Sequence, residues 1–394
     1  MAVASAWVAA GASTLWDYKE DAGPAVDALA HLRLHEFLVA RPIMGPLSII
    51  VRAPFAALGQ LVDAGGVKHG YLSDYRFGIF PCLVVAGIFG LVLARMLERD
   101  RRPLVARVAV VVLAVINPVS LRAIHFGHPE EILGAALLAA AAVAAVRGRL
   151  KLAAALLGLA LVNKQWALIG APAVVITLWG TQGWTRLKRP LAIFAGIAAV
   201  VTAPLLIADA GSLFDLTRNL ADLRGSYLFP ASIWYPYGTE LGPDHFVQMS
   251  RGLRDMPQWI AITARPLIAL MAIVVPLALR KRVWRDPAAR ALPLLALVML
   301  LRCALDPADN GYYHAPFFYA VLAADALVGR FYATAAAVVL LQLPTTLGPS
   351  AVDLNRFYVC WASIFAVYLG GRASGLDWVA LIRQGVRRPL RAPS

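Results

Sequence analysis

Three carboxylates lie within five residues near the start of the chain, in the segment 16–21 (WDYKED). This clustering is unusual because only 15% of the residues are charged. Asp17 and Asp21 are four residues apart, so they would share one face if the segment were helical. A carboxylate held beside a hydroxyl group can act as a general base toward it. Both aspartates are therefore candidate catalytic residues, with a solvated loop or a helix cap as the alternative interpretation.

A second group of titratable side chains lies in the segment 125–131 (HFGHPEE). It places His125 and His128 close in sequence to Glu130 and Glu131. We expect the two imidazoles and Glu130 to hydrogen-bond a polar substrate, with capping of the following helix as the alternative. Histidine and glutamate also bind metal ions, but no third or fourth ligand follows at a diagnostic spacing. No metal site is therefore predicted.

Two basic residues are candidates for binding a phosphate group. Lys164 lies between two apolar runs, next to Gln165, and Arg302 ends a third apolar run. A lysine in such surroundings has a desolvation cost unless it meets an anion, although it can also snorkel toward lipid headgroups. The guanidinium of Arg302 can pair with phosphate through two parallel hydrogen bonds. We expect both residues to hold an anionic substrate group, with Gln165 contributing to substrate binding.

The turn that follows Arg302 concentrates polar and aromatic side chains in the segment 306–314 (DPADNGYYH). Tyr312, Tyr313 and His314 offer the aromatic faces and hydrogen-bonding groups that suit a sugar ring. Tyrosines are also common anchors at a membrane interface, which is the alternative for these two. We include all three residues in the candidate substrate-binding site.

The composition of the chain indicates what kind of molecule positions these residues. Of its 394 residues 60% are hydrophobic, against about 45–50% in ordinary soluble domains. This excludes a soluble domain, and the continuous apolar runs exclude the alternating pattern of a β-barrel. The sequence predicts one all-α domain, a polytopic bundle of about 11–12 transmembrane helices over residues 1–394. The three cysteines lack the spacing of a disulfide framework or a zinc site.

Charge divides the predicted loops into two sets. One set is rich in Lys and Arg and comprises segments 99–102, 147–151, 186–189, 280–290, residue 330 and the tail 372–394. The positive-inside rule makes this side cytoplasmic. The other side holds all seven histidines and the two longest loops, 17–76 and 209–258. We therefore expect a plasma-membrane protein with an external active site, whose net charge of +14 meets membrane lipids and not nucleic acid.

The first external loop contains two segments that are typical of interfacial helices. Residues 27–39 (DALAHLRLHEFLV) alternate apolar and polar faces, and residues 42–61 are apolar but interrupted by prolines. Such helices lie in the interface plane with the apolar face toward the acyl chains. We expect the two segments to frame a groove for a lipid chain, with a simple membrane anchor as the alternative.

Together these features resemble the GT-C class of integral-membrane glycosyltransferases. The similarity is greatest to the actinobacterial mannosyltransferases of glycosyltransferase family 87, which depend on polyprenyl-phosphate sugars. It is carried by segments 16–21 (WDYKED), 41–45 (RPIMG), 51–55 (VRAPF), 127–130 (GHPE), 164–165 (KQ) and 312–314 (YYH).

The resemblance implies transfer of a sugar, with mannose expected, from a polyprenyl-phosphate carrier to a lipid-linked or cell-envelope glycan acceptor. It also implies inversion of the anomeric centre, with an aspartate of the first loop as the base. Asp17 matches that aspartate best, and Asp21 is its rival. No glycine-rich phosphate loop is present, so no nucleotide and no other cofactor is expected. The alternative is a transporter or a lipid flippase, in which charged residues would line a path through the membrane.

Overall fold

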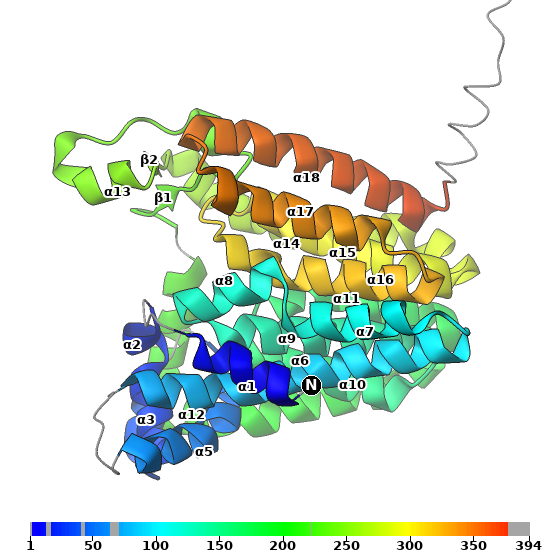
Figure 1. Ribbon diagram of the computed structural model, residues 1–394, viewed down its shortest axis with the longest axis horizontal. Coiled ribbons are helices and arrows are strands. Elements are labelled where there is room, and N and C mark those ends of the chain that lie inside the picture. Colours follow the sequence, from blue (N-terminus) through cyan, green and yellow to red (C-terminus); the bar gives the residue numbers. More distant parts are fainter. Residues whose placement is uncertain (1, 13–16, 41–43, 64–70, 222, 377–394) are drawn as a thin grey trace, which may run out of the picture.

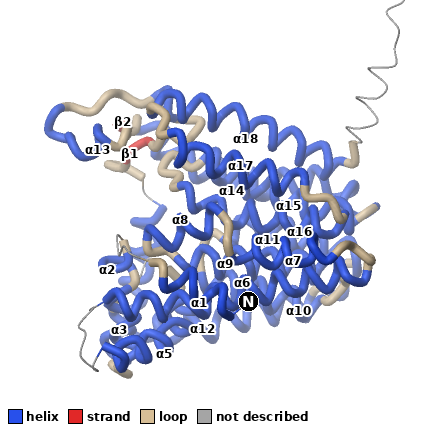
Figure 2. The backbone as a smooth tube through the Cα atoms, viewed as in Figure 1, coloured by secondary structure: helices blue, strands red, loops and turns tan. Residues whose placement is uncertain are grey.

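The structure is a computed structural model that describes residues 2–12, 17–40, 44–63, 71–221 and 223–376. Most helices run along the long axis of the molecule and form one bundle (Figure 1). Within the described residues the only sheet has two short strands, in which β1 (Tyr227–Leu228) pairs antiparallel with β2 (Arg254–Asp255) (Figure 2). The prediction of an all-α polytopic bundle is confirmed.

The first part of the chain contributes one apolar helix and a set of shorter ones. These are α1 (Ala2–Ala10), α2 (Tyr18–Asp21), α3 (Gly23–Ala30), α4 (Leu34–Val39) and α5 (Pro46–Asp63). Where the sequence suggested one interfacial helix over 27–39, the structure has α3 and α4, separated by a turn. Leu32 adopts a φ of 56° in that turn. A residue in this left-handed region cannot continue a right-handed helix, so the chain changes direction there.

The middle of the chain forms the interior of the bundle. Its elements are α6 (Tyr71–Arg99), α7 (Leu104–Val115), α8 (Pro118–Phe126), α9 (Pro129–Val146), α10 (Leu150–Asn163), α11 (Ala167–Gln182), η1 (Trp184–Arg186) and α12 (Lys188–Ala221). Helix α9 is buried almost throughout and packs against α6, α10, α11 and α16. Its many alanines allow neighbouring backbones to approach closely, which is how apolar helices associate in a membrane. Helix α12 has a kink at Asp209 and extends to Ala221, into the segment expected as a long external loop.

The last part of the chain completes the bundle around α15 and α16. The elements are η2 (Tyr235–Tyr237), η3 (Pro243–His245), α13 (Phe246–Ser250), α14 (Gln258–Arg285), α15 (Pro287–Leu305), η4 (Gly311–His314), α16 (Ala315–Val328), α17 (Tyr332–Leu347) and α18 (Ala351–Ser374). Helices α15 and α16 are buried and pack against each other, while α17 lies on α16 and α18 lies on α15.

Six described helices are long and apolar enough to cross a membrane. They are Tyr71–Arg99, Leu104–Phe126, Pro129–Val146, Trp184–Asp209, Gln258–Arg285 and Pro287–Leu305. Four shorter apolar helices accompany them, at Pro46–Val62, Leu150–Asn163, Ala167–Gln182 and Tyr332–Leu347. The chain is therefore a multi-pass membrane protein.

The connections between helices gather at two opposite ends of the bundle (Figure 1). One end, which we call the basic end, carries the α6–α7, α9–α10, α14–α15 and α16–α17 turns and the end of α18. The other end carries α2, α8, the two-stranded sheet and α13. We call this the site end, because the candidate residues of the loops after α1, α8, α10 and α15 lie there.

Candidate active site

The short helix α8 brings His128 to the site end. Asn117 caps this helix, because its Oδ1 accepts hydrogen bonds from the backbone N–H groups of Val119 at 3.1 Å and Ser120 at 2.9 Å. Gly127 ends the helix with a φ of 95°, a left-handed conformation that favours glycine. A separate helix over these residues was not predicted from the sequence. The Asn-Pro start and the glycine stop were the available signals.

Gly127 also lets the first loop lie directly against α8. A Cβ atom at this position would come within 2.7 Å of the Tyr18 backbone nitrogen. The backbone N–H of Asp17 donates a hydrogen bond to the carbonyl oxygen of Phe126 at 3.3 Å. This close approach of two backbones fixes Asp17 beside His128, although the two residues are far apart in sequence.

His128 joins the two candidate bases to a buried carboxylate. Its Nε2 lies 3.2 Å from Oδ2 of Asp17 and 3.7 Å from Oδ2 of Asp21. Its Nδ1 lies 2.8 Å from Oε1 of Glu130. The imidazole also stacks on the ring of Tyr312, with centroids 4.7 Å apart. The structure therefore brings together five of the predicted site residues.

Beneath His128 lies a network of buried charges. Nζ of Lys164 donates to Oε1 of Glu130 at 3.1 Å and lies 3.3 Å from Oε1 of Glu131. Both glutamates are fully buried. The indole N–H of Trp166 donates to the other oxygen of Glu131 at 2.8 Å, and the amide of Asn163 donates to the Glu130 carbonyl oxygen. Lys164 thus neutralises two carboxylates of the protein itself.

Arg52 belongs to the same network of buried charges. It was not among the site residues predicted from the sequence. This side chain of α5 is fully buried, with one guanidinium nitrogen 3.6 Å from Oε2 of Glu130. The guanidinium also lies 5.0 Å from the centre of the Tyr18 ring, an arrangement typical of a cation–π contact. The signal for Arg52 was a single charged residue inside an otherwise apolar helix, which in a membrane protein usually has a function.

The charges around His128 determine its protonation state. Burial alone would lower the pKa of His128, but the Glu130 carboxylate and hydrogen bonds to Asp17 and Glu130 raise it to about 9. The imidazole is therefore protonated at pH 7 and donates from both ring nitrogens. Burial raises the pKa of Asp21, although the His128 charge opposes this effect. A carboxylate with a raised pKa is a stronger base once it is ionised.

Arg302 lies in the last turn of α15, near the ring of Trp166. Its guanidinium donates to the Tyr313 carbonyl oxygen at 3.0 Å and lies 4.5 Å from the centre of the Tyr313 ring. Its distance to the centre of the Trp166 ring is 6.0 Å. Within the described part of the chain no carboxylate forms an ion pair with Arg302, so its positive charge remains available to an anionic ligand.

His314 belongs to a separate polar group, together with Tyr358 and Asp309. Its Nε2 is 3.2 Å from the Tyr358 hydroxyl, which also donates to Oδ2 of Asp309 at 3.4 Å. Burial and, to a smaller extent, the positive charge of Arg302 lower the pKa of His314 to about 3. The ring is therefore neutral at pH 7. Burial also raises the pKa of Asp309 well above its usual range.

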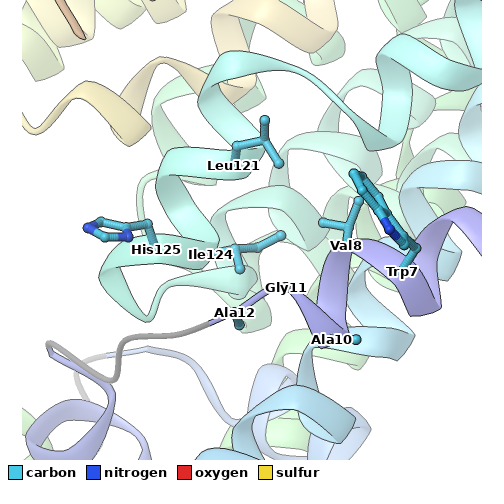
Figure 3. A pocket seen from close by; sticks show the side chains of 8 residues that line it. All are labelled: Trp7, Val8, Ala10, Gly11, Ala12, Leu121, Ile124 and His125. Carbon is cyan, nitrogen blue, oxygen red and sulfur yellow. The ribbon is translucent and has the colours of Figure 1, made fainter.

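Two predicted residues lie outside this arrangement of contacts. Gln165 is exposed at the turn after α10. His125 is exposed on α8 and lines a cavity of about 490 Å³ between α1 and α8, together with Trp7 and Leu121 (Figure 3). Most of the side chains labelled in Figure 3 are apolar, and His125 is the polar one at the rim.

Among the described residues, two groups of side chains have the donor atoms that a metal ion would need. The donors of Asp17, Asp21 and His128 lie within 4.8 Å of one another, and the same holds for Cys303, Asp309 and His314. The protonated state of His128 opposes metal binding in the first group. The nearby Arg302 does so in the second group, because its guanidinium lies 3.9 Å from Sγ of Cys303. The absence of a metal therefore stays a prediction.

Comparisons with known proteins identify the family of this chain. A family model described as glycosyltransferase family 87 matches residues 45–306, which is more than half of the chain. The match includes Arg52, His128, Lys164 and Arg302, and it begins after the first-loop aspartates. No curated protein and no solved structure matches the chain. The site end of this bundle is therefore the candidate active site of a membrane glycosyltransferase, and the chain belongs to glycosyltransferase family 87.

Proposed function

We propose that this enzyme transfers a sugar, in the first instance mannose, from a polyprenyl-phosphate carrier to a hydroxyl group of a lipid-linked or cell-envelope glycan. The acceptor oxygen attacks the anomeric carbon, the bond to the phosphate oxygen breaks, and the configuration inverts. Asp17 takes the proton of the acceptor hydroxyl, with Asp21 as the rival base. The family supports sugar transfer in a membrane; the donor, the acceptor and the base are the proposal.

The observation that carries the proposal is the position of Asp17. Its side chain is 47% exposed, yet its Oδ2 is held 3.2 Å from Nε2 of a nearly buried histidine. His128 is fixed in turn by Glu130 and by stacking on Tyr312. A general base needs both access to the substrate and a fixed orientation, and Asp17 has both.

The leaving phosphate requires positive charge on the protein. Arg302 suits this role because it has no carboxylate partner among the described residues, while Tyr313 holds its guanidinium in place. Lys164 was predicted for the same role, but its ammonium group already contacts Glu130 and Glu131. We therefore propose that Arg302 binds the donor phosphate. Lys164 has an indirect role in this proposal, because its charge keeps Glu130 ionised and Glu130 in turn holds His128.

The remaining predicted residues fit contacts with the sugar and with the lipid. Tyr312 presents its ring beside His128, and Tyr313 lies at right angles to it, with ring centres 5.0 Å apart. His314 follows in the same short helix, η4. The basic turns lie at the end of the bundle opposite these residues, which supports an external active site by the positive-inside rule.

The direct test is transfer by the purified protein from radiolabelled polyprenyl-phosphate sugars, assayed one sugar at a time. Asp17→Asn keeps the shape of the side chain and removes its basicity, so we expect turnover to fall by about 100-fold or more. Glu20→Gln is the matched control, because Glu20 lies in the same segment but is exposed and has no role in the proposal. Asp21→Asn should reduce turnover less than Asp17→Asn.

Three results would count against the proposal. A larger effect of Asp21→Asn would move the base to Asp21. Near-normal transfer by both single variants and by the double variant would remove the first loop from the chemistry. Transfer from nucleotide sugars, with none from polyprenyl-phosphate sugars, would overturn the proposed donor class.

A further inference from the structure

A cavity of about 810 Å³ lies at the basic end of the bundle, opposite the candidate active site. Three arginines from three different elements line it: Arg290 in the first turns of α15, Arg330 in the α16–α17 turn, and Arg372 near the end of α18. None of these residues belongs to the proposed catalytic machinery. The cavity therefore needs an explanation of its own.

The protein holds two of these arginines in defined positions. Nη1 of Arg372 lies 3.2 Å from Oδ1 of the buried Asp325 and 3.3 Å from the Tyr368 hydroxyl. The second oxygen of Asp325 accepts hydrogen bonds from the backbone N–H and the hydroxyl of Thr334, at 2.8 and 3.0 Å. Nη1 of Arg290 donates to the carbonyl oxygen of Arg282 at 2.9 Å. Both guanidinium groups keep further N–H donors for a ligand.

Apart from Asp286, Asp325 and two tyrosines, the rest of the cavity wall is apolar. Ala333 and Ala336 come from α17, while Ile364 and Phe365 come from α18. Ile364 is 62% exposed, so the apolar wall continues onto the outer surface of the bundle. Helix α17 packs on α16 and helix α18 packs on α15, and both α17 and α18 line the cavity. A ligand for this cavity must be anionic at one end and apolar at the other.

We propose that this cavity binds an anionic phospholipid, with its headgroup phosphate on Arg290, Arg330 and Arg372 and its acyl chains between α17 and α18. Three positive side chains against the two carboxylates of Asp286 and Asp325 leave a net charge that complements one phosphate. The positive-inside rule places this end at the cytoplasmic leaflet, where anionic headgroups attract basic residues. The proposal is independent of the glycosyltransferase reaction and of the sugar donor.

The test compares phosphatidylglycerol with phosphatidylcholine of identical acyl chains, bound to the detergent-purified full chain and counted by native mass spectrometry. We expect phosphatidylglycerol to bind at least ten-fold more tightly. The double variant Arg290→Gln, Arg330→Gln should lose about 25-fold of this affinity, on the basis of roughly five-fold for each basic residue near an anionic lipid. The control variant Arg186→Gln, Lys281→Gln removes two charges from the same end, outside the cavity, and should change the affinity less than two-fold.

A second variant separates lipid binding from folding. Ala336→Trp keeps every charge and fills the apolar part of the cavity from a position that is exposed in the structure, so it should also weaken phosphatidylglycerol binding. Equal binding of the two lipids, or an equal loss in the control variant, would overturn the proposal. Full competition by soluble glycerol phosphate would show a site for free phosphate and would also overturn it. Thermal unfolding without added lipid confirms that each variant is folded.

Discussion

His128 lies between two carboxylates in different surroundings, since Asp17 is half exposed and Glu130 is fully buried. Because the pKa of His128 is raised from 6.5 to about 9 in the folded protein, protonation of this ring favours the folded state. That contribution is complete below pH 6.5 and is lost as the pH rises through about 9. The thermal unfolding temperature should therefore fall between pH 7 and pH 9.

Measuring the unfolding temperature between pH 7 and pH 9 in two variants tests whether His128 causes this fall. In His128→Gln the fall should be clearly smaller, because the titrating group is gone. His31→Gln, at an exposed histidine of the first loop, should behave like the unmodified protein. An unchanged pH dependence in His128→Gln would mean that another group is responsible.

Substitution of Arg302 should mainly weaken donor binding, whereas substitution of Lys164 should mainly lower the stability of the fold. Arg302→Gln should weaken donor binding by about ten- to one-hundred-fold, the effect of losing one charge-assisted hydrogen bond, with a modest change in unfolding temperature. Lys164→Met leaves the buried Glu131 without its cation and removes one of the three cations around Glu130, so it should destabilise the protein by about 3–5 kcal/mol. Donor KM and thermal unfolding, measured side by side, separate the two roles. Unchanged donor KM in Arg302→Gln would contradict the assignment.

The turn between α8 and α9 determines whether the first loop reaches the site. Gly127→Ala introduces a Cβ atom at a φ of 95°, where Tyr18 leaves no room. We expect a loss of about 1–3 kcal/mol in stability from the strained backbone. In addition, transfer activity should fall at temperatures at which the variant is fully folded, because Asp17 moves away from His128.

Gly148→Ala is the matched control for this element. Gly148 has a φ of 67° and lies at the basic end, where an added Cβ meets only the end of the Gln182 side chain. It should lose stability to a similar extent and keep its activity in proportion to the folded fraction. Equal activity losses in the two glycine variants would show that strain alone, and not the position of the first loop, causes the effect.

Hydropathy and charge were sufficient to predict most of the long helices and the basic turns, because both depend on local composition. They did not reveal α8 as a separate helix, because its nine residues begin at Pro118, shortly after the end of the apolar helix α7 at Val115. They also did not reveal the turn at Leu32 within the first loop. The contact between Asp17 and His128 joins residues 111 positions apart. Such proximity depends on how helices pack, and no pattern within one segment encodes it.

The sequence was sufficient to predict most residues of the candidate site, but not the contacts between them. Carboxylates, imidazoles and tyrosines near the site end stand out because they interrupt an apolar sequence. The sequence did not show that Lys164 is satisfied by Glu130 and Glu131, because that arrangement requires α9 and α10 to lie side by side. Arg52 was overlooked for the same reason, since its partner lies on a distant helix.

At the scale of the whole molecule, the two ends of the bundle should face opposite sides of the membrane. After Cys360→Ser, the two remaining cysteines are buried, so single cysteines can be introduced and labelled selectively. Cysteines at His125 and Gln165 should react with a membrane-impermeant reagent from outside the cell. Cysteines at Arg101 and Lys281 should react only after the membrane is opened. Labelling of both pairs from the same side would contradict the topology.

The buried charge network beneath His128 limits how this sequence can change over evolutionary time. Each of Arg52, Glu130, Glu131 and Lys164 contacts an opposite charge that is itself buried, so a change at one position leaves its partner uncompensated. Intermediates with a single substitution would be selected against even when the double substitution is well tolerated. Among homologous chains these four positions should therefore covary, and the tendency should weaken at the exposed Asp17, where water can replace a lost partner.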